Sequence, residues 1–313
     1  MTGDMNEERE LHPKMHAGEP AAAVVRADRR KRRSLAGAVV VAAVVFLFWN
    51  LLDVGALMLP LHPLLLAVVE LAVIALFAWR YLPARLTTAG KPWAAREERE
   101  RRAALRLRAV PRSAWGTIAA WVASSLVLDQ LVTMVWFHLV PRANDYANPL
   151  AELLDRPFGW LPVYLTLLVA APLMEEVAFR GWVQRPLERR AGPVVAIAIT
   201  SLLFALAHGL PLLIPYYIVA GVVLGASVYL TRSLWVAMIV HAAHNAWSNA
   251  SDAMGLTNER AIEWTANPLV FWLAVAGLAG WALVMVWLGM RLREASRRCM
   301  PAPVTRPLTS VEP

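Results

Sequence analysis

Long apolar runs, spaced along most of the chain, restrict this sequence to the membrane more firmly than any other feature. Hydrophobic residues make up 58% of the 313 positions, and the runs approach the roughly 20 residues that cross a bilayer as a helix. The expected fold class is an all-α polytopic membrane protein, with about eight transmembrane helices and an intramembrane cavity whose polar residues are described below. The predicted spans are residues 34–59, 64–81, 115–140, 159–179, 193–210, 216–230, 234–247 and 268–290.

Basic residues lie between these runs, and this pattern sets membrane topology. Eight spans place the arginine-rich tails and loops on one side, so the positive-inside rule puts both termini in the cytoplasm. We expect a multi-pass protein of the cell membrane whose partners include membrane lipids. The predicted segments are a basic cytoplasmic tail (1–33), two helices with a basic cytoplasmic loop (34–113), a six-helix membrane core (114–292) and a cytoplasmic tail (293–313).

Charge and cysteine content exclude other classes. A net charge of +8 in a soluble chain would suggest nucleic acid, but no basic segment here is large enough to fold alone, so no nucleic-acid partner is expected. The single cysteine, Cys299, leaves no internal disulfide and no Cys-based zinc site.

Two adjacent carboxylates, Glu175 and Glu176, follow the apolar run at 160–171. A charged side chain in hydrocarbon costs several kcal/mol, so such groups face a protein interior or a wet cavity and carry function. On a helix, Glu176 and Arg180 are four residues apart and can pair on one face. Glu175 points about 100° away from Glu176. We therefore expect Glu176 to be neutralised and Glu175 to stay free for chemistry.

Polar groups inside two later spans supply partners for this carboxylate. His208 follows Phe204 by one helical turn, and His241 and Asn245 share a helix face, with His244 beside them. A carboxylate can act as the general base for water, and imidazole can orient that water or protonate the leaving amine. An amide N–H can stabilise an oxyanion. A lone membrane histidine usually packs, but this combination favours hydrolysis.

The three motifs resemble those of the CPBP family, which comprises CAAX proteases and bacteriocin-processing enzymes and is also called the ABI-type intramembrane proteases. The resemblance covers about residues 161–250. It implies a metal-independent glutamate endopeptidase, similar to type II CAAX prenyl endopeptidases, without a cofactor. Its substrate would be a membrane-associated or lipidated, CAAX-type peptide or protein. The motifs are Glu175-Glu176-x-x-x-Arg180, Phe204-x-x-x-His208 and His241-x-x-x-Asn245.

The resemblance also implies a role for each site residue. Glu175 would be the catalytic base that activates water, and His208 the imidazole that shares this water. His241 and Asn245 would stabilise the oxyanion. His208 lies deeper in its span than Glu175 does, which tilted helices or a water-filled funnel would reconcile. Supporting roles in orientation, helix pairing and lining of the site fall to Glu176, Arg180 and Phe204.

Two alternative functions stay open. Glu175, His208 and His241 also make up a His₂Glu set suited to zinc, although no His-Glu-x-x-His occurs on one helix and the amide of Asn245 is a poor zinc ligand. A non-proteolytic scaffold or immunity protein would instead use the polar cluster to bind a peptide. A transporter is disfavoured, because corresponding halves of the chain show no pair of broken helices.

Five other polar positions within the spans belong to none of the three motifs. Glu70, Asp129 and Gln130 are expected to line the same cavity as the motif residues, and His244 is expected to serve packing. Asp53 lies near the outer end of the first predicted span, where interfacial exposure would explain it.

Overall fold

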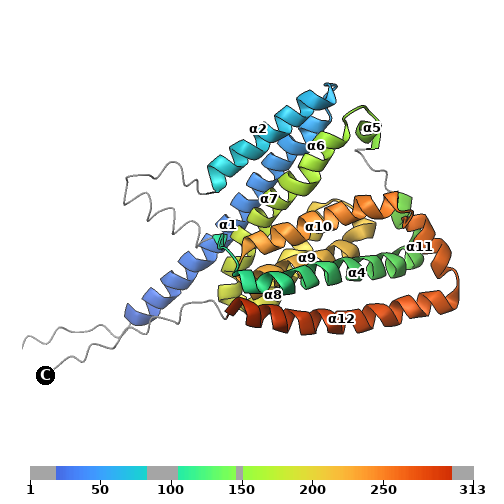
Figure 1. The fold of residues 1–313 in the computed structure, drawn as a ribbon. Helices are drawn as coiled ribbons and strands as arrows, with labels where there is room; N and C mark the ends of the chain where they lie inside the picture. The colour runs from blue at the N-terminus through green and yellow to red at the C-terminus, as the bar shows by residue number, and fades with distance from the viewer. Residues whose placement is uncertain (1–18, 83–104, 146–150, 298–313) are drawn as a thin grey trace, which may run out of the picture.

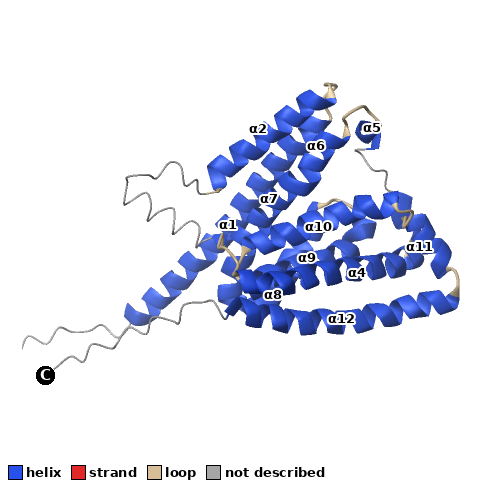
Figure 2. Cartoon of the chain, in the orientation of Figure 1, coloured by secondary structure: helices blue, strands red, loops and turns tan. Residues whose placement is uncertain are grey.

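The computed structural model describes residues 19–82, 105–145 and 151–297. Every regular element in these ranges is helical, and none is a strand (Figure 2). The all-α fold class is therefore confirmed. The α-helices are α1 (Glu19–Leu57), α2 (Pro63–Tyr81), α4 (Trp115–Leu139), α5 (Ala151–Leu154), α6 (Trp160–Leu165), α7 (Ala171–Glu175), α8 (Arg185–Ala207), α9 (Ile214–Thr231), α10 (Leu234–Ala253), α11 (Asn258–Thr265) and α12 (Pro268–Arg297).

Shorter elements join or interrupt these helices. Two stretches are π-helical, with wider turns than the α-helix, and both lie next to α7. Such stretches are rare and occur frequently at functional sites. They are η4 (Thr166–Ala170) and η5 (Glu176–Gln184), and the 3-10 turns are η2 (Arg112–Ala114), η3 (Pro141–Asp145) and η6 (Pro211–Leu213).

Six helical stretches of the described residues are long and apolar enough to cross a membrane. The count of eight stays a prediction, and two features account for the difference. The fourth and fifth predicted spans run together in one helical stretch, and α10 is not counted because its second half is polar. The six stretches are Val39–Leu57, Pro63–Tyr81, Arg112–Leu139, Trp160–Ala207, Pro211–Thr231 and Pro268–Ser296.

Three helical segments extend beyond the predicted ends of the spans. Helix α1 begins at Glu19, so the basic run at 29–33 continues a helix rather than ending a tail. Helix α12 extends to Arg297, beyond the predicted start of the second tail. The predicted basic loop at 180–190 is helical, because η5 leads directly into α8. The chain bends only later, at Gly192 (φ 79°), a backbone conformation that glycine adopts readily.

Several sequence predictions fall outside the described residues. Most of the first tail lies in residues 1–18, the basic loop in residues 83–104, and most of the second tail, with Cys299, in residues 298–313. Of the proposed cytoplasmic loop, the described end is anchored to the core. The backbone N–H of Leu234 donates to the carbonyl of Arg106 at 3.0 Å, and the Ser233 hydroxyl donates to the carbonyl of Arg108 at 2.8 Å.

The helices form two groups (Figure 1). Helices α1 and α2 lie beside α6 and α7 in one group, and α4, α8, α9, α10 and α12 pack together in the other. Contacts between α1 and η5, and between α10 and η4, join the groups. The segment from η4 to η5, which carries the glutamate pair, therefore lies where the two groups meet.

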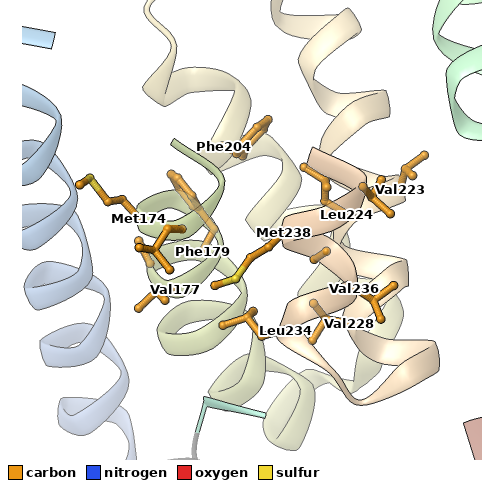
Figure 3. Close-up of a cluster of buried hydrophobic side chains, with 14 of the residues drawn as sticks. Met174, Val177, Phe179, Phe204, Val223, Leu224, Val228, Leu234, Val236 and Met238 are labelled. Atoms are coloured by element: carbon orange, nitrogen blue, oxygen red, sulfur yellow. The ribbon is translucent and has the colours of Figure 1, made fainter. Parts of the chain in front are cut away.

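Close approach of α8 and α9 depends on two glycines. A Cβ at Gly221 would lie 2.8 Å from the Cβ of Ser201, and one at Gly225 would lie 3.1 Å from Ile197. The spacing Gly-x-x-x-Gly on one helix face lets membrane helices pack closely, since lipid tails offer no water to expel. An apolar cluster fills the adjoining interior (Figure 3). It includes Met174, Val177, Phe179, Phe204, Val223, Leu224, Val228, Leu234, Val236 and Met238.

Candidate active site

The first motif lies at the junction of α7 and the π-helical η5, where Glu175 ends one element and Glu176 begins the next. Arg180 Nη1 donates to Glu176 Oε1 at 3.0 Å, and neither side chain has any exposed surface. Arg180 Nη2 also donates to the carbonyl of Gly221 on α9, at 3.2 Å. The predicted pairing of Glu176 with Arg180 is therefore confirmed, and this buried pair ties η5 to α9.

Phe204 on α8 covers the guanidinium of this pair. The Arg180 Cζ atom lies 4.5 Å from the centroid of the Phe204 ring. A cation over an aromatic face gains about 0.5–2 kcal/mol, more when both groups are desolvated. The same ring meets His208 edge-on at 4.7 Å and His241 at 5.9 Å between centroids. Phe204 thus brings all three motifs around one aromatic side chain.

His241 on α10 lies between the two glutamates. Its Nδ1 is 3.0 Å from Glu176 Oε1, and its Nε2 is 3.9 Å from Glu175 Oε2. The first distance is a hydrogen bond and the second is too long for one. Because the Glu176 carboxylate accepts, Nδ1 carries the hydrogen, and Nε2 is directed toward Glu175. The hydrogen bond to Glu176 therefore orients the His241 ring so that its Nε2 faces Glu175.

His208 ends α8 as its C-terminal cap. Its Nδ1 lies 2.8 Å from the carbonyl oxygen of Phe204, which can only accept, so Nδ1 carries the hydrogen and Nε2 holds the lone pair of the neutral ring. The imidazole stacks on the Tyr217 ring, with centroids 3.8 Å apart and planes at 23°. These two contacts fix both the orientation and the tautomer of His208.

Asn245 on α10 contacts the first π-helical stretch. Its Nδ2 donates to the carbonyl of Leu167 in η4 at 2.7 Å. One amide hydrogen is therefore bound to protein backbone, and the second hydrogen of the amide is the one that a ligand could use. This bond ties α10 to the segment that carries the glutamates.

Glu175 differs from Glu176 in that no guanidinium or imidazole hydrogen-bonds to its carboxylate among the described residues. The side chain is 7% exposed, and its Oε2 atom, like Glu176 Oε2, is buried without a hydrogen bond among the described residues. Buried polar atoms in folded proteins nearly always have a partner, and an exception calls for an explanation. The arrangement is a carboxylate without a cationic hydrogen-bond donor, beside His241 Nε2 and next to Glu176, which is paired through Oε1.

Comparison with protein families gives one match to this part of the chain. Residues 157–247 match the family described as type II CAAX prenyl endopeptidase Rce1-like. This segment, less than half of the chain, is therefore similar to that family, and the resemblance inferred from the three motifs is confirmed. Searches among curated proteins and among solved structures gave no match.

The Rce1-like region contains all the predicted site residues. The match spans Glu175, His208, His241 and Asn245, together with Glu176, Arg180 and Phe204. The contacts described above bring the three motifs together. They include His208, which the sequence places deeper in its membrane span than Glu175. His208 lies against Phe204 and Tyr217 at the end of α8, and Phe204 in turn packs on Arg180 of the first motif. The catalytic role of each residue stays a prediction.

A second polar cluster lies outside the three motifs. His244 Nε2 is 2.9 Å from the Ser125 hydroxyl, and its Nδ1 is 3.5 Å from Asp129 Oδ1. The Tyr216 hydroxyl donates to the same Asp129 oxygen at 2.8 Å. His244 thus joins α10 to α4, as expected of a packing residue. Asp129 lines a polar cavity of about 160 Å³ that Tyr217 also lines, and the Tyr217 ring stacks on His208.

The acidic residues of the first two helices are buried together. Asp53 is 3% exposed and Glu70 is 0% exposed, so the expectation that Asp53 is explained by interfacial exposure was wrong. The two carboxyls interact with each other, and Glu70 also interacts with the hydroxyl of Thr166 in η4. Neither oxygen of Glu70 has a hydrogen bond among the described residues. No described cation faces this pair.

The zinc alternative requires at least three ligands around one point. The described residues contain no group of three or more His, Cys, Asp or Glu side chains that could hold a metal ion. The Nδ1 atoms of His241 and His208 are engaged by Glu176 and by a carbonyl, which leaves each Nε2 available, as in many metal-binding histidines. It is the spacing of the predicted His₂Glu set, not the ring orientation, that keeps it from forming a ready zinc site in this arrangement.

Three contributors to the Rce1-like region escaped the sequence analysis. Tyr217 stacks on His208, the carbonyl of Leu167 accepts from Asn245, and the carbonyl of Gly221 accepts from Arg180. A backbone carbonyl leaves no signature in a sequence, whereas the Gly-x-x-x-Gly spacing that begins at Gly221 was a readable signal.

Proposed function

We propose that this protein is an intramembrane endopeptidase that uses Glu175 to activate water for hydrolysis of a peptide bond in a membrane-associated, prenylated CAAX-type substrate. The observation that carries the proposal is the contrast within the glutamate pair. Glu176 Oε1 accepts from both Arg180 and His241, whereas neither a guanidinium nor an imidazole hydrogen-bonds to Glu175 among the described residues. A general base needs a free lone pair within reach of water.

In this mechanism Glu175 accepts a proton from water while the water oxygen attacks the peptide carbonyl carbon. The same carboxyl then gives the proton to the amine nitrogen as the C–N bond breaks. His208 holds the water through Nε2, because its Nδ1 is committed to Phe204. The free amide hydrogen of Asn245, supported by its other bond to Leu167, stabilises the oxyanion. His241 keeps the two carboxylates in fixed positions.

An apolar groove next to this centre suits a lipid chain. It has a volume of about 290 Å³, lies between α1, η5 and α8, and includes Phe179 and Leu203 in its walls. Phe179 meets Phe204 edge-on at 5.5 Å, so the groove ends beside the motif residues. A prenyl chain bound here would hold the peptide near Glu175. Replacing Ala43, which lines the groove on α1, with Trp should raise KM for prenylated peptide and spare kcat.

The testing experiment is cleavage of a fluorogenic prenylated peptide by purified protein in detergent. Glu175→Gln should lower kcat by roughly 10²–10⁴-fold, since it removes the general base without changing shape. Glu263→Gln, on the exposed face of α11, is the matched control and should retain full activity. Both variants should unfold at the temperature of the parent.

A chelator arm separates the metal-independent mechanism from zinc. Activity that survives chelation and is lost in Glu175→Gln supports the proposal. Activity lost on chelation and restored by zinc would replace it with a metalloprotease. A third outcome is that the parent cleaves no prenylated or other membrane peptide, while the Glu175→Gln variant still binds the peptide. That result would favour the peptide-binding scaffold.

A further inference from the structure

A basic pocket lies at the end of the spans from which α8 starts and α9 ends. Its volume is about 470 Å³. Arg232, which caps the C-terminus of α9, has the left-handed backbone that often terminates a helix (φ 55°), so the pocket lies at the level where the apolar span ends. The lining residues are Arg106, Arg185, Glu188, Arg189, Pro193, Tyr229 and Arg232.

Positive charge in this pocket exceeds negative charge. Four guanidinium groups and one carboxylate line it. The carboxylate of Glu188 is already occupied, because Arg106 binds both of its oxygens and Arg232 lies 3.3 Å from Oε2. Arg185 is close enough to Arg106 and Arg189 for their charges to interact. An anion would relieve this repulsion, and arginine suits a phosphate through paired hydrogen bonds.

An apolar groove reaches the same end of the molecule. It lies between α4, α9 and α12, has a volume of about 480 Å³, and is lined mainly by aliphatic side chains. Its one charged lining residue is Arg293, near the end of the last span. Val222, Val286 and Met290 are 42%, 63% and 60% exposed along it. This surface therefore faces the hydrocarbon of the bilayer.

Tyr229 connects the groove to the basic pocket. Its ring lies 4.9 Å from the Arg232 guanidinium carbon and 5.9 Å from that of Arg293. It also lines the pocket itself. A ligand with an apolar chain in the groove and a negative head at these arginines would contact both surfaces at once. Phospholipids have this shape, and basic pockets between membrane helices bind anionic headgroups.

We propose that the basic pocket and the groove between α9 and α12 together bind an anionic phospholipid, with its phosphate at the arginines and an acyl chain along the groove. The site lies apart from the glutamate pair and does not depend on the proposed protease activity. Zwitterionic lipid would fill the groove but would bring no net negative charge to the arginines.

The test is a titration of the purified full chain in detergent with phosphatidylglycerol or phosphatidylcholine carrying the same acyl chains, followed by thermal unfolding from tryptophan fluorescence. Phosphatidylglycerol should raise the unfolding temperature more, and native mass spectrometry should detect it bound. Arg189→Gln in the pocket and Arg293→Gln at the groove should each weaken its apparent affinity about fivefold, since one arginine near a membrane surface contributes about 1 kcal/mol. Both side chains are exposed, so the fold should survive.

Two controls separate the headgroup from the chain. Arg260→Gln, an exposed arginine on α11 at the other end of the molecule, should leave the lipid titration unchanged. Val222→Trp, which fills the open side of the groove, should weaken phosphatidylglycerol binding while the arginines stay intact. Equal shifts with both lipids, equal losses in Arg260→Gln, or equal stabilisation by soluble glycerol phosphate would each overturn the proposal.

Discussion

Two pairs of carboxyl groups are buried in this molecule, and their surroundings differ. Glu176 and Glu70 both have no exposed surface. Glu176 receives hydrogen bonds from Arg180 and His241, whereas Glu70 faces Asp53 and Thr166, with no described cation beside it. Burial therefore does not decide what a membrane carboxyl does. The side chains built around it decide whether a charge can be kept there.

The largest loss of stability is expected on removal of Arg180, the cation that binds Glu176. Arg180→Leu leaves Glu176 buried without its guanidinium, which should lower the free energy of unfolding by about 3–5 kcal/mol. The matched control is Arg291→Leu, because Arg291 forms an exposed pair with Glu294 at 3.8 Å and should change stability by less than about 1 kcal/mol. Denaturant titration in detergent measures both. Equal losses of unfolding free energy in the two variants would show that burial does not strengthen the Glu176–Arg180 ion pair.

An intermediate loss of stability is expected at Gly221, whose backbone carbonyl accepts a hydrogen bond from Arg180. A Cβ at Gly221 would lie 2.9 Å from the Cα of Ser201, so Gly221→Ala should push α8 and α9 apart and cost about 1–3 kcal/mol. It should also shift the carbonyl that accepts from Arg180. Gly116→Ala in α4, with nothing within 4 Å of its added Cβ, is the control and should be neutral or slightly stabilising. Unfolding temperatures compare the two.

The smallest effect is expected at the second pair. The double substitution Asp53→Asn with Glu70→Gln keeps both shapes and removes two carboxyls that have no cation to bind. It should leave the unfolding free energy unchanged or raise it by about 1 kcal/mol, because a buried carboxyl without a charged partner gains little from ionisation. Glu176→Gln should instead destabilise, because it strands Arg180. A loss at Asp53 and Glu70 as large as that at Glu176 would erase the difference between the pairs.

The sequence predicted the parts of the site that depend on spacing along one helix. The Glu176–Arg180 pair, the common face of His241 and Asn245, and the packing position of His244 follow from four-residue and neighbouring spacings. They hold in the structure even though η5 is π-helical. The all-α class likewise followed from the apolar runs.

What the sequence could not provide were contacts between segments far apart in the chain. Asp53 and Glu70 lie on different helices, and only the packing of α1 on α2 brings them together. The acceptor of Asn245 is a backbone carbonyl, which every residue has. Helix ends were misplaced for a related reason. The basic run at 29–33 reads as a tail by charge, yet arginine and lysine are good helix formers and α1 includes them.

The wide turn of η4 gives this membrane segment a phase that an α-helix of the same length would not have. Successive residues of an α-helix are rotated by about 100°. A π-helical turn holds about one residue more than an α-helical turn, so an α-helix with one residue fewer completes about the same rotation. Deleting one residue from Thr166–Ala170 should therefore let the segment return to α-helical winding with Glu176 and Arg180 still directed to Gly221. Deleting a second residue would rotate everything that follows by about 100° and separate Arg180 from Gly221. The geometry of the polar cluster is encoded by residue count as much as by residue type.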